Sequence, residues 1–149
     1  MNKKNRKAII LGIGMCVLLG TLLFYRKHPL MPTAIINGTK FTLELAVTQK
    51  EIEKGLGGRV TLAPKHGMLF LHDHKELYPF WMGGMEFPLD FVWIDGNLIV
   101  DITKNVPMET QGEISRLSPR VPVDKILELN AGEADRYNIK VGDTLLFNK

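Results

Sequence analysis

The chain has 149 residues and a formal net charge of +3, a length that suits one ordinary domain with a short extension. Six of its 19 basic residues precede position 28 and all 16 acidic residues follow it, which leaves 13 basic against 16 acidic residues in the remainder. The remainder therefore lacks the basic excess of a nucleic-acid-binding domain, so no nucleic-acid partner is expected. The single cysteine, Cys16, lies in the N-terminal apolar run, which excludes disulfides and thiolate chemistry from the rest of the chain.

Residues 8–25 form an uncharged run of eighteen residues. As a helix it spans about 27 Å, close to the thickness of a bilayer core. Four basic side chains precede the run and two follow it, which places the N-terminus in the cytoplasm by the positive-inside rule. We therefore predict a cytoplasmic basic tail (1–7), a single transmembrane signal anchor (8–25) and an extracytoplasmic domain at the cell membrane.

The alternative for this segment is a cleaved secretory signal. Cleavage requires small residues at alternating positions after the apolar run, whereas Arg26 to Pro32 contains none. A lipoprotein site at Cys16 is also poor, because Met15 precedes it and apolar residues continue beyond it. The sequence thus favours an uncleaved anchor, followed by a proline-bearing linker (26–33) and a domain (34–149).

The first elements of the domain have clear local signals. Asn37-Gly38 is typical of a tight hairpin turn. Residues 41–48 alternate apolar and polar, which predicts a strand with one buried face. Thr48 to Glu51 matches a capping box and predicts a short helix with Ile52 and Leu56 on its apolar face.

The rest of the domain contains short strands separated by turns. Predicted strands cover 68–71, 91–94, 98–102, 126–129 and 144–147, with a hairpin turn at 95–97, a long polar loop at 104–123 and one or two helical turns at 131–137. This pattern indicates a mainly β domain, a compact antiparallel β-barrel or sandwich with one or two short helices.

Several short blocks of sequence point to one family. They are Gly55-Leu56 with Arg59, Gly67 to Phe70, Phe80-Trp81-Met82, Pro88-Leu89-Asp90, Leu127 to Gly132 and Gly142-Asp143. In this order and spacing the chain resembles the prokaryotic domain of unknown function 192 (DUF192) from Thr39 to Phe147. The resemblance implies a compact, mostly β domain, often exported or anchored, and brings no activity, substrate or catalytic residue.

The chain departs from that resemblance at one place. Family members usually have lysine, asparagine and threonine where this chain has Gly83, Gly84 and Met85. If this loop shapes a site, the site here is less polar than is usual in the family.

Arg59 and Asp90 are the charged members of the matched blocks. One interpretation is a clamp for an anionic or hydroxyl-rich ligand, with Arg59 as the donor. The alternative is that the two residues pair with each other or cap backbone groups. Trp81, with Phe80 and Phe87, offers either a stacking surface for a sugar ring or part of the core.

Soft metal ligands are concentrated between positions 66 and 85. They are His66, Met68, His72, His74, Met82 and Met85. Imidazole and thioether groups suit Cu(I), while methionine also fills gaps in a core. Copper binding is therefore one hypothesis for the function, and no metal or other cofactor is assigned from sequence.

Two further hypotheses remain open for function. The first is a non-catalytic binding or interaction module of the cell envelope that recognises a small polar ligand, a glycan or an envelope protein, with Arg59, Trp81, Met82 and Asp90 as candidate ligand residues. The second is a hydrolase of envelope glycans that uses carboxylates such as Asp90 and Glu128. Catalytic nucleophile, zinc-protease and phosphate-loop motifs are absent from the sequence, which favours the binding module.

Overall fold

The computed structural model describes residues 31–109, 112 and 114–148. The predicted basic tail, the predicted transmembrane segment and most of the predicted linker lie outside these residues. Within the described part of the chain, no helix is both long enough and apolar enough to cross a membrane.

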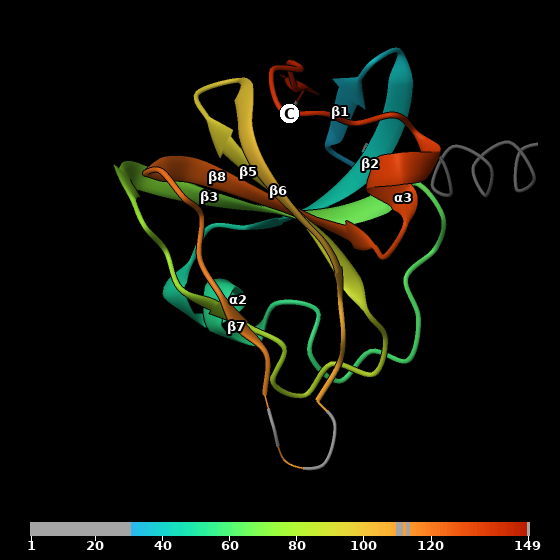
Figure 1. Ribbon diagram of the computed structural model, residues 1–149, viewed down its shortest axis with the longest axis vertical. Coiled ribbons are helices and arrows are strands. Elements are labelled where there is room, and N and C mark those ends of the chain that lie inside the picture. The colour runs from blue at the N-terminus through green and yellow to red at the C-terminus, as the bar shows by residue number, and fades with distance from the viewer. Residues whose placement is uncertain (1–30, 110–111, 113, 149) are drawn as a thin grey trace, which may run out of the picture. The chain divides into compact units, whose positions relative to one another are not determined.

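A seven-stranded sheet forms the body of the domain (Figure 1). Its strands are β1 (Thr33–Ile36), β2 (Thr39–Ala46), β3 (His66–Glu76), β5 (Leu89–Asp95), β6 (Leu98–Val106), β8 (Val123–Asn130) and β9 (Leu146–Asn148), in the order β6-β5-β8-β3-β2-β1-β9. A second, two-stranded sheet joins β4 (Phe80–Trp81) to β7 (Arg116–Leu117). The helices are α2 (Gln49–Lys54) and α3 (Glu133–Arg136).

The sheet curls into a half-barrel. An isolated antiparallel bridge joins Leu98, at the start of the edge strand β6, to Thr144, two residues before the opposite edge strand β9. The mainly β prediction with one or two short helices is confirmed. The sheet is antiparallel at every other strand pair, as the sequence pattern indicates, but β2 and β3 run parallel. The segment that contains α2 connects them as a crossover, and a crossover returns the chain in the same direction.

Local turn and cap signals are confirmed in the structure. Asn37 and Gly38 both have positive φ, 50° and 75°, as the tight β1–β2 hairpin requires. At the start of α2 the side-chain oxygen of Thr48 accepts from the backbone N–H of Glu51, and the Glu51 carboxylate accepts from the backbone N–H of Thr48. The helix therefore begins where its capping box predicts.

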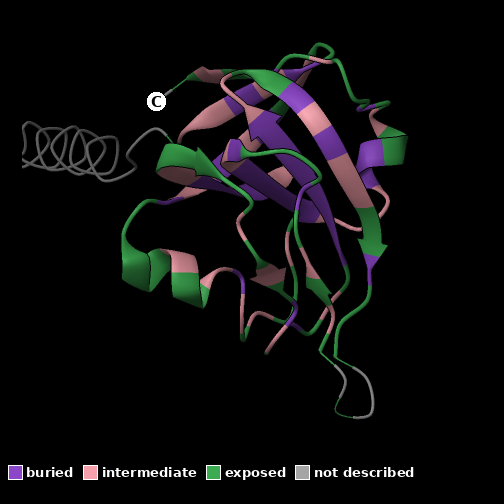
Figure 2. Cartoon of the chain, turned by 60° about the vertical axis from the view of Figure 1, so that its left-hand side comes forward, coloured by how far each residue is buried: buried purple, intermediate pink, exposed green. Residues whose placement is uncertain are grey.

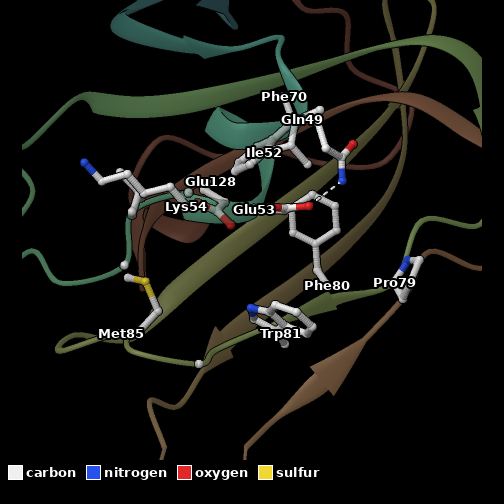
Figure 3. A pocket seen from close by; sticks show the side chains of 14 residues that line it. Gln49, Ile52, Glu53, Lys54, Phe70, Pro79, Phe80, Trp81, Met85 and Glu128 are labelled. Atoms are coloured by element: carbon white, nitrogen blue, oxygen red, sulfur yellow. Dashed lines mark hydrogen bonds between the residues drawn. The ribbon is translucent and has the colours of Figure 1, made fainter.

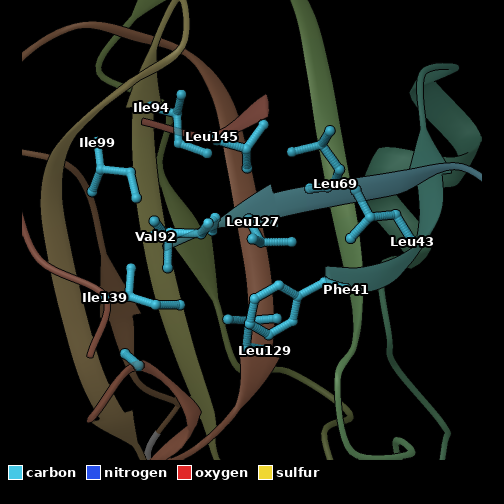
Figure 4. Packing of buried hydrophobic residues seen from close by; sticks show 13 residues of the cluster. Phe41, Leu43, Leu69, Val92, Ile94, Ile99, Leu127, Leu129, Ile139 and Leu145 are labelled. Carbon is cyan, nitrogen blue, oxygen red and sulfur yellow. The ribbon is translucent and has the colours of Figure 1, made fainter. Parts of the chain in front are cut away.

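Hydrophobic residues are buried on both faces of the curled sheet (Figure 2). The first core lies on the concave side, because it gathers side chains from both edges of the sheet (Figure 4); its members include Ile36, Phe41, Leu43, Leu69, Val92, Ile99, Leu127, Leu129 and Leu145. The second core lies on the opposite face and includes Leu56, Met68, Phe70, Met82, Leu89, Phe91, Trp93 and Ile126.

Burial on two faces changes the interpretation of β2. Phe41 and Leu43 are buried in the first core as the alternation predicts, but Ala46, on the other face, is buried as well. Val47 follows the strand and is exposed. The predicted 104–123 loop is also shorter than expected, because β6 extends to Val106 and β8 begins at Val123.

Candidate functional site

A pocket of about 200 Å³ lies between α2 and the second core (Figure 3). It is lined by α2 and the glycine-rich turn after it, by β3, by the segment around β4 and by β8; the lining residues used below are Glu53, Lys54, Phe70, Phe80, Trp81, Gly83, Met85 and Glu128. The walls are mainly aromatic and aliphatic, and a carboxyl group from the interior strand β8 is among the polar lining groups.

Local backbone features position the segments that line the pocket. The capping box fixes the start of α2, and Gly55 ends the helix with φ of 48°, a value that favours glycine. After the helix, the backbone N–H of Gly58 donates to the carbonyl of Gly84 at 2.9 Å, which joins the turn to the loop that follows β4. The Gly83–Met85 stretch, where the sequence departs from the family pattern, thus supplies one wall.

Glu128 is the most unusual residue of the pocket. It lies in β8 directly opposite Met68 of β3 and Phe91 of β5, so its side chain points into the second core. Only 5% of the residue is exposed, and its Oε2 atom is buried without a hydrogen-bond partner in the described structure. Burial raises the pKa of the Glu128 carboxyl to about 8, against a smaller opposing attraction from Arg59. At neutral pH the group is therefore mostly protonated.

Arg59 makes a bidentate ion pair with Glu44 of β2. The distances are 2.5 Å from Nη1 to Oε1 and 2.7 Å from Nη2 to Oε2. The hydrogen bonds to Arg59 lower the pKa of Glu44, and those to Glu44 raise the pKa of Arg59. Glu44 and Glu128 both lie opposite Met68, on either side of β3. This proximity explains why the Arg59 charge lowers the pKa of Glu128 in part, against the larger effect of burial.

Asp90 lies on the other face of the sheet. It is fully buried; its Oδ1 accepts from the backbone N–H of Asn105 at 2.8 Å and its Oδ2 from that of Ala134 at 2.9 Å. The first contact holds Asn105 at a positive φ of 53°, and the second satisfies a backbone donor in the first turn of α3. Asp90 therefore caps backbone groups and does not pair with Arg59, in line with one part of the structural alternative raised from sequence.

The aromatic residues around β4 divide between surface and core. Trp81 is 54% exposed, lines the pocket and has the guanidinium of Arg116 over its ring at 5.7 Å. Phe80 also lines the pocket and packs edge-to-face on Phe70, with ring centroids 5.0 Å apart. Met82 is completely buried in the second core. The structure thus brings Trp81 and Phe80 to the pocket and leaves the Met82 side chain as packing.

The candidate copper ligands are held by different neighbours. His66 Nδ1 contacts the carbonyl of Pro64 at 3.1 Å, His72 stacks on the Tyr78 ring at 3.7 Å, and His74 lies 3.4 Å from Glu76. Burial lowers the pKa of His72, which keeps its ring neutral. Among the residues that the structure places, no three His, Cys, Asp or Glu side chains form a metal-binding group.

Sequence reasoning offered Glu128 only as a hydrolytic carboxylate and did not place it in a pocket. Its signal was an acidic residue inside the apolar run 126–129, where a solvated glutamate is out of place. The contributions of Phe70 and of α2 had no such signal. They depend on the parallel crossover that sets the helix over β3 and β8, and alternation along one strand does not reveal a crossover.

The fold and the pocket define a class: a curled, mixed-sheet β domain with a small, aromatic-walled cavity beside its second core. The chain belongs to the DUF192 family, described as "Uncharacterized ACR", which it matches over residues 33–147. This confirms the resemblance noted from the sequence blocks.

Two crystal structures are similar to this chain. A protein from Sinorhizobium meliloti described as a "putative transcription regulator" is 30% identical with a TM-score of 0.71, and the match covers 81% of this chain and 97% of that one. A protein of unknown function from Novosphingobium aromaticivorans is 31% identical with a TM-score of 0.70, and the match covers 76% of this chain and 83% of that one. A comparison with curated proteins gives no match.

Proposed function

We propose that this domain is a non-catalytic binding module that takes a small molecule into the pocket between α2 and the second core. The observation that carries the proposal is the Glu128 carboxyl, which lines the pocket with a buried oxygen left unpaired. A buried polar group without a partner costs about 1–3 kcal/mol. A ligand that supplies the missing partner offsets that cost.

The shape of the pocket supports a small ligand. A volume of about 200 Å³ is below the range of about 300–1,000 Å³ that is usual for drug-sized ligands, so a compact molecule or one end of a larger one fits. Phe70, Phe80 and Trp81 provide apolar walls, and half-exposed Trp81 gives the ligand a contact near the solvent.

A binding role is favoured over carboxylate catalysis by the placement of the two carboxyls that sequence suggested. Asp90 and Glu128 lie on adjacent strands but point to opposite faces of the sheet. Both oxygens of Asp90 already accept from backbone donors. A pair of carboxylates that share one glycosidic bond must face the same cleft.

Tryptophan fluorescence provides a direct test. The chain has two tryptophans, and Trp93 is fully buried while Trp81 lines the pocket. In a Trp93→Phe variant of the full chain, purified in a non-ionic maltoside detergent, the emission comes from Trp81 alone. We expect members of a library of small neutral, cationic and anionic compounds to change this emission in a saturable way.

Calorimetry with the same compounds separates pocket binding from other binding. Trp81→Ala should weaken the affinity about tenfold, the upper range for losing one aromatic contact. Val141→Ala, a change at an exposed apolar residue outside the pocket, should leave it unchanged. If no compound saturates, or if the two variants bind equally well, the proposal is wrong.

We also propose that residues 8–25 hold this module at the cell membrane on the extracytoplasmic side. The support is the uncharged run of eighteen residues and the basic residues that flank it. The full chain should resist alkaline carbonate extraction from membranes, and a variant without residues 8–25 should be released. In intact spheroplasts, added protease should digest the domain; protection of the domain would reverse the proposed orientation.

A further inference from the structure

The pocket combines three aromatic rings with a buried carboxyl group and few free donors. Phe70, Phe80 and Trp81 line it together with the Met85 thioether and Glu128 (Figure 3). Aromatic faces attract cations through the quadrupole of the ring, and desolvation strengthens that attraction. Trp81 already takes the Arg116 guanidinium over its ring at 5.7 Å, so the ring is one that interacts with a cation in this fold.

The ionisable groups that line the pocket have the same preference once Glu128 is ionised. Glu53 and Glu128 line it, against the single ammonium of Lys54. Arg59 is the charged group whose attraction reaches Glu128, but both of its terminal nitrogens are occupied by Glu44 of β2. The neighbours of Glu128 across the sheet, Met68 and Phe91, do not titrate. Among the lining residues an anion would therefore meet two carboxyl groups and one ammonium group, and no guanidinium.

We infer that the ligand of this pocket is a small organic cation, an alkylammonium or quaternary ammonium group, held against the wall of Phe70, Phe80 and Trp81 with Glu128 as its counter-ion. This rests on the proposed binding function and specifies its ligand class. The cation supplies a partner for the buried carboxylate, while its alkyl groups contact the aromatic walls. A neutral ligand of the same shape satisfies only the second requirement.

Binding of such a cation is linked to a proton. In the free domain Glu128 holds its proton up to about pH 8, so a cation that pairs with the carboxylate must release that proton at lower pH. The affinity should therefore rise roughly tenfold per pH unit toward about pH 8 and level off above it. A neutral hydrogen-bond acceptor that uses the protonated carboxyl shows the opposite trend, because it loses its donor as the pH rises.

The test compares choline with its uncharged isostere dimethylbutanol, in which carbon replaces the quaternary nitrogen. Both are titrated against the full-length Trp93→Phe chain in maltoside detergent, with Trp81 emission and calorimetry as readouts, from about pH 6 to about pH 9 around the Glu128 pKa. We expect choline to bind at least about tenfold more tightly at the upper end of this range, and the preference to shrink as the pH falls.

Glu128→Gln provides the matched variant, because the amide keeps the size of the side chain and removes its charge. The variant should lose the choline preference and the pH dependence while it still binds dimethylbutanol, which shows that the pocket is folded. If dimethylbutanol binds as tightly as choline at high pH, or if Glu128→Gln keeps the preference, the cation inference is wrong and the binding function stands. If neither probe nor any library compound binds, the binding function fails too.

Discussion

Asp90 and Glu128 are buried carboxyl groups on opposite faces of the same sheet, and their surroundings differ. Asp90, on the side of the first core, accepts one backbone hydrogen bond at each oxygen. Glu128, on the side of the second core, has a buried oxygen without a partner and borders a pocket. A buried carboxyl group whose oxygens all accept hydrogen bonds stabilises the fold. A buried carboxyl group with an unpaired oxygen destabilises it, and a ligand that pairs with that oxygen offsets the cost.

The two cores also differ in how completely they are covered. The first core is enclosed by the curl of the sheet and draws side chains from strands along its whole width. The second core is covered by short elements, the six-residue helix α2 and the two-stranded β4–β7 sheet. Short covering elements leave gaps that a continuous sheet does not, and the pocket lies in such a gap. Substitutions at Asp90, Gly67 and Glu128 test this contrast.

The largest effect is expected at Asp90. Asp90→Ala removes both acceptors and leaves the backbone N–H groups of Asn105 and Ala134 without partners, which should lower the free energy of unfolding by about 3–5 kcal/mol. Asp90→Asn, which keeps one acceptor oxygen, should lose about half as much. Urea unfolding followed by circular dichroism measures both. A loss below about 1 kcal/mol for Asp90→Ala would show that the stability of the side with the first core does not depend on this residue.

An intermediate effect is expected at Gly67. A Cβ atom there would lie 2.7 Å from the carbonyl oxygen of Glu128 and 2.9 Å from side-chain atoms of Leu127 and Leu129. Since a backbone atom of the interior strand β8 must move, Gly67→Ala should cost about 2 kcal/mol in the same unfolding assay. The control is Gly83→Ala on the pocket side, where the Cβ atom meets Trp81 at 3.5 Å and should cost less than about 0.5 kcal/mol. Equal losses of unfolding free energy for Gly67→Ala and Gly83→Ala would show that the two faces of the sheet are packed equally tightly.

Measured per pH unit, the smallest effect is the pH slope at Glu128. Its pKa is raised to about 8 in the folded chain from the ordinary value of 4.5, so between these values the folded state holds a proton that the unfolded state has released. Stability should therefore fall as the pH rises through this window, by up to about 1.4 kcal/mol per pH unit, and level off above about pH 8.

Glu128→Gln should flatten this slope, as measured by urea unfolding from about pH 5 to about pH 9. Burial also raises the pKa of Glu133 and lowers the pKa of His72, so two opposing slopes should remain in the variant: stability falls with pH through Glu133 and rises with pH through His72 below its ordinary pKa of 6.5. Parallel stability profiles for the wild type and Glu128→Gln would mean that Glu128 is ionised in the fold.

Much of the fold follows from local sequence signals. The Asn37-Gly38 hairpin, the Thr48–Glu51 capping box and the turn at Gly96 all lie where their chemistry predicts. These features depend on the φ values and hydrogen bonds of a few consecutive residues. The predicted transmembrane segment, 8–25, depends on local hydropathy and charge in the same way, and it stays a prediction.

The site depended on contacts between distant parts of the chain. The sequence offered Trp81 as either a stacking surface or part of the core and Glu128 as an available carboxyl, yet it suggested Asp90 and Met82 equally as ligand residues. Whether a strand face borders a pocket or is covered by a core depends on the segments that pack on it. The alternation of apolar and polar residues within one strand is the same in both situations.

The sequence by itself therefore determined the turns, the short helices, the mainly β character and the family of this protein. The tertiary structure alone decided that β2 and β3 run parallel, that Arg59 pairs with Glu44, and that Glu128 borders a cavity while Asp90 does not. The physical reason is the separation along the chain of the residues that interact. Turns and caps are satisfied within about four residues, whereas strand partners and the burial of a charge are set by residues far away in the chain.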